Sequence, residues 1–452
     1  MASGKITKGL AENERKLLSA RLSSVLFYAT FGLLMFGPLA FGAVEPWSIF
    51  ILEAGATLLT VVWFAKQWLD GEINIRWNPL FLPMTGFGIL ILVQIVFRAS
   101  AYPHDTFSQA LLYVAYALLC FLSAQTLLRG SQARKLALIF IVYGTAVAAF
   151  ALLQGISPNG KLYWIRQPRM GGNIYGPYVN HNHYAGLMEL LLPIPLVLSL
   201  TQLAHERERT AAGVAAALMA GTLFLSGSRG GMLAILVELA LLSVLLVRQK
   251  KGVRLAAGAA GFVAVLLVLL VWVGGRELTH RVSTISTEAR TEISGGMRLS
   301  IDRDTLRMFR RKPLLGWGLG AFPVVYPEFR SFYTNFFVNE AHNDYLQLLA
   351  EMGLAGFAAM LWFWVVLGRA ALPKLKNWTT DISGAVTLAA SLSVTGILVH
   401  SFFDFNLQIP ANAALFYVFC TVAASPRLLQ RARKRKPAPT TTEEILPASE
   451  VV

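Results

Sequence analysis

The segment from Asn339 to Gly353 holds the residues best suited to catalysis. It is polar at its start and becomes apolar toward its end, a pattern that predicts a helix with His342 in its first turn. The positive partial charge at a helix N-terminus disfavours imidazolium, so a histidine there stays neutral and can accept a proton. This is the requirement for a general base. The competing interpretation is a histidine with a purely structural role.

Two segments, 156–183 and 274–353, are too long to be simple connections. Their cations are nearly all arginine, namely Arg166, Arg169, Arg276, Arg281, Arg290, Arg298, Arg303, Arg307, Arg310, Arg311 and Arg330, with only Lys161 and Lys312 besides. A guanidinium group donates two parallel hydrogen bonds to an oxyanion and stays charged at any relevant pH. An arginine-lined cavity therefore suits a diphosphate. Contact with lipid headgroups is the alternative for these arginines.

A helix with one polar face is expected where Arg303, Arg307 and Arg310 recur at helical spacing, and it should end before Pro313. The following stretch, Pro313 to Phe322, has the glycine density of a tight turn. Such a turn could bring backbone close to a ligand, or it could serve only to reverse the chain.

Arg229 lies between two apolar runs in the sequence SGSRGG. A cation at membrane depth is costly without an anionic partner. It could pair with Glu189 or Glu238, or it could face a substrate phosphate, and the sequence leaves both interpretations open.

The stretch from Gly176 to Gly186 contains Asn180, Asn182 and an H-x-H pair. Two histidines at this spacing could bind a metal, but no carboxylate or third histidine is adjacent. We find no paired-aspartate motif either, so we expect no metal site and no cofactor.

These candidate residues must be positioned by membrane helices. Of the 452 residues 55% are hydrophobic and only 14% are charged, and the mean hydropathy is +0.54. Soluble domains are closer to one-quarter charged, and a helical crossing needs about 20 apolar residues. The sequence predicts an all-α, polytopic membrane protein with about twelve crossings: Ser23–Ala43, Ser48–Ala65, Pro79–Phe97, Phe107–Leu128, Leu136–Gly155, Tyr184–Leu203, Ala211–Leu225, Gly231–Val247, Leu255–Val273, Leu354–Leu372, Ile382–Phe402 and Ala411–Ala424. The Ala211 run is the shortest and the least secure crossing.

The distribution of lysine and arginine predicts the orientation. Most of these residues lie in segments that become cytoplasmic if both termini are cytoplasmic. We therefore expect a cytoplasmic segment 1–22 with no removable signal peptide, a transmembrane domain 23–426 whose long loops 156–183 and 274–353 are periplasmic, and a disordered cytoplasmic tail 427–452. The net charge of +15 then reflects topology and attraction to anionic lipids, not nucleic-acid binding. Cys120 and Cys420 lie inside apolar runs, which excludes a disulfide framework in the loops.

Four stretches together resemble the O-antigen ligase and polymerase superfamily of bacterial envelope polysaccharide enzymes. They are GPYVNHNHYAG, SGSRGG, MRLSIDRDTLRMFRRKPLLGWGLGAF and EAHNDYLQLLAEMGLAGF, within about 176–357, and HSFFDFNLQIPANA, at 400–413, is also typical of the group. The last two of the four stretches are the most specific. Asp302 departs from the family pattern, which has an aromatic residue near this position.

The resemblance implies an inner-membrane glycosyltransferase that takes a glycan from undecaprenyl diphosphate at the periplasmic face. By position His342 is the base, and Arg229 and Arg298 bind the donor diphosphate. Supporting roles are expected for Asn180, Asn182, Arg303, Arg307, Asn343, Asp344 and Tyr345. An O-antigen ligase acting on lipid A-core, inverting and metal-independent, is favoured over a polymerase or a protein oligosaccharyltransferase. A transporter is disfavoured because the two halves show no internal repeat.

Overall fold

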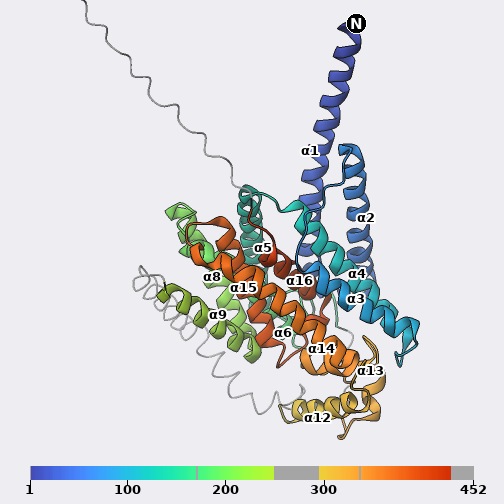
Figure 1. Ribbon diagram of the computed structural model, residues 1–452. Coiled ribbons are helices and arrows are strands. Elements are labelled where there is room, and N and C mark those ends of the chain that lie inside the picture. Colours follow the sequence, from blue (N-terminus) through green and yellow to red (C-terminus); the bar gives the residue numbers. More distant parts are fainter. Residues whose placement is uncertain (1, 169–171, 249–294, 335–336, 429–452) are drawn as a thin grey trace, which may run out of the picture.

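The computed structural model describes residues 2–168, 172–248, 295–334 and 337–428, and every regular element in these ranges is helical (Figure 1). The helices are α1 (Ala2–Leu39), α2 (Pro46–Asp70), α3 (Phe81–Val96), α4 (Pro103–Thr126), α5 (Gly130–Ile156), α6 (His181–Leu191), α7 (Pro193–Leu200), α8 (Glu206–Ser226), α9 (Arg229–Arg248), α12 (Gly295–Arg311), α13 (Phe322–Val325), α14 (Asp344–Ala371), α15 (Ile382–His400) and α16 (Pro410–Ala424).

Nine helical segments in the described part of the chain are long and apolar enough to cross a membrane, with α6 and α7 counted as one. The shorter apolar helices α3 and α16 bring the number of predicted runs found as helices to eleven. The Leu255–Val273 run lies outside the described residues. The Ala211 run, expected to be the least secure, belongs to the 21-residue helix α8, which is long enough to span. The chain is an all-α, multi-pass membrane protein.

Proline and glycine set several helix ends. Pro46, Pro103 and Pro410 occupy first-turn positions, where the missing N–H costs nothing. Pro193 begins α7 in the same way and divides the sixth crossing in two. Gly227 closes α8 in a left-handed conformation (φ 79°) that a side chain would disfavour, so the chain turns sharply into α9.

The helices α6, α15 and α16 form the buried centre of the bundle, whereas α1 and α2 lie at one side (Figure 1). At one end of the bundle, Arg76 donates to the backbone oxygens of Leu127 and Pro426. Segments that the charge count assigns to one side of the membrane therefore meet. The helix α12 lies across the opposite end, below α14 in Figure 1, and we call this the α12 end.

The amphipathic helix predicted around Arg303 and Arg307 is confirmed as α12. Its buried residues Ile301 and Met308 pack in a small separate core with Phe322 and Tyr326, while Arg303 is exposed. Asp302 does not disturb this packing, because it is only half-buried beside the core face.

The glycine-rich turn after α12 bonds along the backbone of α14. Trp317 and Gly318 donate from their backbone N–H groups to the carbonyl oxygens of Ala350 and Glu351, both at 2.9 Å. Gly316 has φ 70°, and a methyl group on it would lie 2.3 Å from the Glu351 carbonyl carbon. These glycines permit a close approach to the backbone of α14. The turn therefore serves to reverse the chain and pack it against α14, and not to bring backbone close to a ligand.

The helix α14 is interrupted at Gly353 (φ 61°, ψ −161°). On the far side of this kink, Leu354 and Ala355 donate to the carbonyl oxygens of Pro313 and Leu314, at 2.8 and 3.1 Å. A short first helix is thus set off from the membrane span that follows. The turn after α12 is bonded to both parts.

Candidate active site

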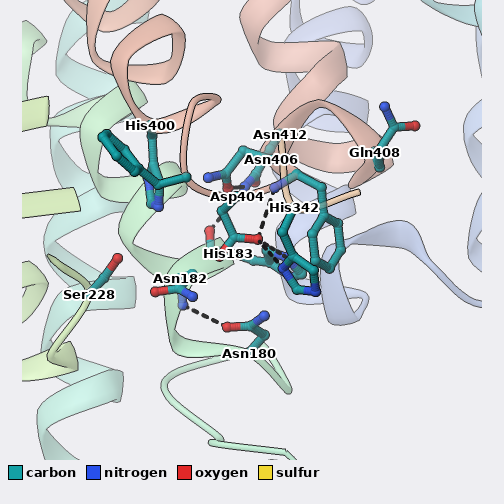
Figure 2. A network of polar contacts seen from close by, with 12 residues as sticks. Asn180, Asn182, His183, Ser228, His342, His400, Asp404, Asn406, Gln408 and Asn412 are labelled. Atoms are coloured by element: carbon teal, nitrogen blue, oxygen red, sulfur yellow. Dashed lines mark hydrogen bonds and ion pairs between the residues drawn. The ribbon is translucent and has the colours of Figure 1, made fainter. Parts of the chain in front are cut away.

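Four segments meet at the α12 end and bring polar side chains together (Figure 2). They are the start of α6, the turn between α8 and α9, the segment just before α14, and the loop 401–409 between α15 and α16. Each lies at a helix end, where side chains can be held by hydrogen bonds to free backbone groups.

The prediction that His342 lies in the first turn of a helix is wrong by two residues. The helix α14 begins at Asp344, and Asn343 is its N-cap, with a side-chain oxygen that accepts from the backbone N–H groups of Tyr345 (3.2 Å) and Leu346 (3.1 Å). Asparagine is a strong N-cap residue, and this fixes the helix start one residue after it. His342 therefore precedes the cap.

His342 adopts a left-handed backbone conformation, with φ 53°. For a residue other than glycine this conformation costs on the order of 1–3 kcal/mol, and such residues cluster at active sites. Here it directs the imidazole toward the loop 401–409 (Figure 2).

Asp404, in that loop, is the partner of His342. Its Oδ1 lies 3.6 Å from Nδ1 of His342 and 4.0 Å from Nε2 of His183, and its Oδ2 lies 3.9 Å from Nη2 of Arg298. Burial alone would raise the pKa of this carboxyl, but His342, His183 and Arg298 hold the pKa of Asp404 well below its usual range. Asp404 is therefore an ionised carboxylate facing three cationic or potentially cationic groups.

Because His342 lies outside α14, the carboxylate of Asp404 and not the helix dipole determines the state of its imidazole. A carboxylate against Nδ1 favours the tautomer with a proton on Nδ1, which leaves Nε2 as the acceptor. The ring of Phe405 packs edge-on against both imidazoles, with centroid separations of 4.8 Å for His342 and 4.7 Å for His183. The imidazole of His342 is thus oriented by charge and by packing.

Arg298, predicted to bind the donor diphosphate, contacts the same carboxylate as His342, Asp404. Its Nη1 donates to the backbone oxygen of Phe403 at 2.7 Å, and its side chain is about a third exposed. A guanidinium anchored at one edge can direct its remaining donors to a bound anion. Asp302 also lies in this region, and burial raises the pKa of its carboxyl although the charges of His342 and Arg298 oppose this.

Arg229 is the exposed first residue of α9 and follows Ser228, which is labelled in Figure 2. The interpretation in which it pairs with a membrane-embedded acid is wrong. Glu189 Oε1 lies 2.7 Å from Nδ1 of His400 instead, and neither oxygen of Glu238 has a hydrogen-bond partner among the described residues. Among the described residues, neither of these two acids forms an ion pair with Arg229.

The histidines of the H-x-H pair face different groups. His181 Nδ1 donates to the backbone oxygen of Ser226 at 2.8 Å, which ties the start of α6 to the end of α8. His183 faces Asp404, as described above. Between them Asn182 is buried, and Asn180 caps α6 by accepting from the backbone N–H of Asn182 at 2.9 Å.

The other supporting residues divide into two groups. Asp344 accepts from the Ser401 hydroxyl at 2.7 Å and so holds the loop 401–409 against α14, while Tyr345 donates to the Leu398 carbonyl at 2.7 Å and ties α14 to the end of α15. Arg303 and Arg307 lie on the exposed face of α12, where Arg307 pairs with Asp304 at 2.9 Å. No described contact joins these two arginines to His342.

Sequence reasoning missed Asp404 as a site residue. The segment HSFFDFNLQIPANA contains it, and an acidic residue between two phenylalanines at a predicted crossing's end was the available signal. Asn412, from the same segment, was missed as well. It donates to the His183 carbonyl at 2.9 Å and so joins α16 to the site.

Part of this chain matches the model of a known protein family. Residues 214–361 match the O-antigen ligase family. The match extends from α8 into α14 and includes Arg229, Arg298 and His342, so the resemblance is confirmed for that region. No curated protein matches the chain significantly. The family is one of membrane glycosyltransferases that act on lipid-linked glycans, which supports a transferase activity for this multi-pass protein.

Proposed function

We propose that this protein is an O-antigen ligase. It transfers a glycan from undecaprenyl diphosphate to a hydroxyl group of lipid A-core at the periplasmic face of the inner membrane. The observation that carries the proposal is the contact of His342 and Arg298 with the same ionised carboxylate, Asp404. This contact supports the proposal because transfer from a diphosphate donor requires a base for the acceptor and a cation for the leaving group.

In the proposed reaction, Nε2 of His342 removes the proton from the acceptor hydroxyl. The hydroxyl oxygen attacks the anomeric carbon of the donor sugar from the face opposite the diphosphate. A new glycosidic bond forms while the bond between that carbon and the diphosphate oxygen breaks, so the configuration inverts. Asp404 does not touch substrate, and it stabilises the imidazolium that His342 becomes.

Arg298 and Arg229 bind the diphosphate and stabilise the charge that develops on it as it leaves. Fixed guanidinium donors can supply this stabilisation without a metal ion. The two arginines come from different elements, α12 and the start of α9, so the donor would lie between them. Exposure of both side chains supports their access to a substrate.

The test uses purified protein in lipid nanodiscs with a labelled lipid-linked glycan and lipid A-core. Label on lipid A-core supports the ligase. Label on a longer lipid-linked chain would instead identify a polymerase, and label on an added protein acceptor an oligosaccharyltransferase. No transfer to any acceptor by well-folded protein would overturn the assignment as a transferase.

A further inference from the structure

A second polar cluster lies within the bundle, beside the start of α9. It consists of Glu189 on α6, Glu238 on α9 and His400 at the end of α15, all of which are essentially without solvent exposure. His400 Nδ1 lies 2.7 Å from Glu189 Oε1. Ionisable residues at such depth are costly and call for a functional explanation. The reaction proposed above does not use them.

The imidazole of His400 lies against the backbone of Gly230, the residue that follows Arg229. A methyl group on Gly230 would lie 2.5 Å from Cδ2 and 2.7 Å from Nε2 of His400. A methyl group on the next residue, Gly231, would lie 3.0 Å from Oε1 of Glu189. The first turn of α9 is therefore seated directly on the His400–Glu189 pair, and Figure 2 shows His400 near Ser228.

The same turn is fixed from its other side. The Ser228 hydroxyl accepts from the Gly231 backbone N–H at 3.2 Å, and the Ser226 carbonyl accepts from His181. These contacts set where α9 begins, and the His400 ring limits how closely the first turn of α9 approaches the end of α15. The position of the Arg229 backbone thus depends on the ring of His400, which Glu189 holds in place.

We propose that the buried His400–Glu189 pair is a positioning device for Arg229, and so for the binding of the donor diphosphate. The pair does not touch substrate. The proposal rests on the proposed function in that it assumes Arg229 binds the donor.

The first test is Gly230→Ala. Because the added methyl group meets a ring that is held by Glu189, α9 must shift and carry Arg229 with it. We expect the KM for the lipid-linked donor to rise about tenfold, as expected for loss of one charge-assisted hydrogen bond, while kcat changes less than about threefold. Gly221→Ala in α8 is the matched control, because no heavy atom lies within 4 Å of its added methyl group.

The second test is rescue. In His400→Ala the ring atoms that meet Gly230, Cδ2 and Nε2, are removed together with the bond to Glu189. The double variant Gly230→Ala/His400→Ala should therefore have a lower donor KM than Gly230→Ala alone. A KM raised by the product of the factors for the two single variants would show independent losses, overturn the proposal and leave the cluster with a role in folding only.

A third comparison separates this proposal from the proposed function. If positioning acts through Arg229, Gly230→Ala should raise the donor KM much less in an Arg229→Ala background than in the wild type. An equal effect in both backgrounds would refute the positioning role while leaving Arg229 as a donor-binding residue. A normal donor KM in Arg229→Ala itself would show that Arg229 does not bind the donor, which contradicts the proposed function.

Discussion

Replacing Asp404 with asparagine should slow transfer by about a hundredfold without weakening donor binding. The substitution keeps the shape of the side chain and removes the charge that stabilises imidazolium during proton transfer. Over the 3.6 Å between Oδ1 and Nδ1 of His342, two unit charges attract by about 4 to 5 kcal/mol at an effective dielectric constant of about 20. If about 3 kcal/mol of this acts in the transition state, the rate falls about 10²-fold.

Donor binding should survive this substitution because Arg298 has a second anchor. Its Nη1 still donates to the Phe403 carbonyl at 2.7 Å, whereas its contact with Asp404 is the longer one, 3.9 Å. We expect a donor KM within about threefold of the wild type, since weak ion pairs contribute little.

The assay is single-turnover transfer of a labelled glycan by monodisperse protein in nanodiscs. Asp381→Asn is a suitable control, because Asp381 caps the opposite end of α15 and asparagine is an equally good N-cap. A rate near that of the wild type in well-folded Asp404→Asn would refute the role given to this carboxylate. A loss in donor affinity with an unchanged rate would show that Asp404 acts by positioning Arg298 and not by stabilising the imidazolium of His342.

Four further outcomes are expected. His342→Ala should lower the transfer rate about 10²- to 10⁴-fold while donor binding persists. Arg298→Ala should weaken donor binding as well as the rate, and Arg298→Lys should restore part of the loss. Steady-state kinetics on folded variants distinguish the two effects. The pKa of Asp404 is depressed in the folded protein, so its ionised carboxylate contributes its full stabilisation of the fold above the unfolded pKa of about 4 and loses it as the pH falls further. The thermal unfolding temperatures of Asp404→Asn and the wild type should therefore differ at pH 7 and converge in acid. Chelation of divalent metal should leave transfer intact, and activity restored by added Mg²⁺ would contradict this. Topology reporters should indicate a cytoplasmic location at Arg427 and a periplasmic one within 283–300, and a periplasmic signal at Arg427 would contradict the charge count.

The membrane helices and α12 were predictable because their signals are local. Each apolar run specifies its own helix in lipid, and the spacing of Arg303 and Arg307 specifies an amphipathic helix wherever it packs. The start of α14 was missed by two residues because the onset of apolar residues does not show which polar residue caps the helix.

The pairing of the charged groups was not predictable. Asp404 and His342 are far apart in the sequence, and Asp404 lies in an apolar context that gives no indication of a partner. Glu189 could have paired with Arg229 by charge and by depth. The choice of His400 depends on how α6, α9 and α15 pack, and no single stretch of sequence contains that information.

The backbone bonds between the turn after α12 and both halves of α14 have a mechanical consequence. Arg298 lies on α12, and His342 lies two residues before α14, so the two side chains belong to one block held together by these bonds although the chain between them is long. If this block tilts when a bulky glycan enters, the cation and the base tilt together and keep their mutual distance. Chimeras between related enzymes should therefore exchange the whole interval from α12 to the end of α14, because a junction at Gly353 would separate the two parts of α14 to which the turn after α12 is bonded.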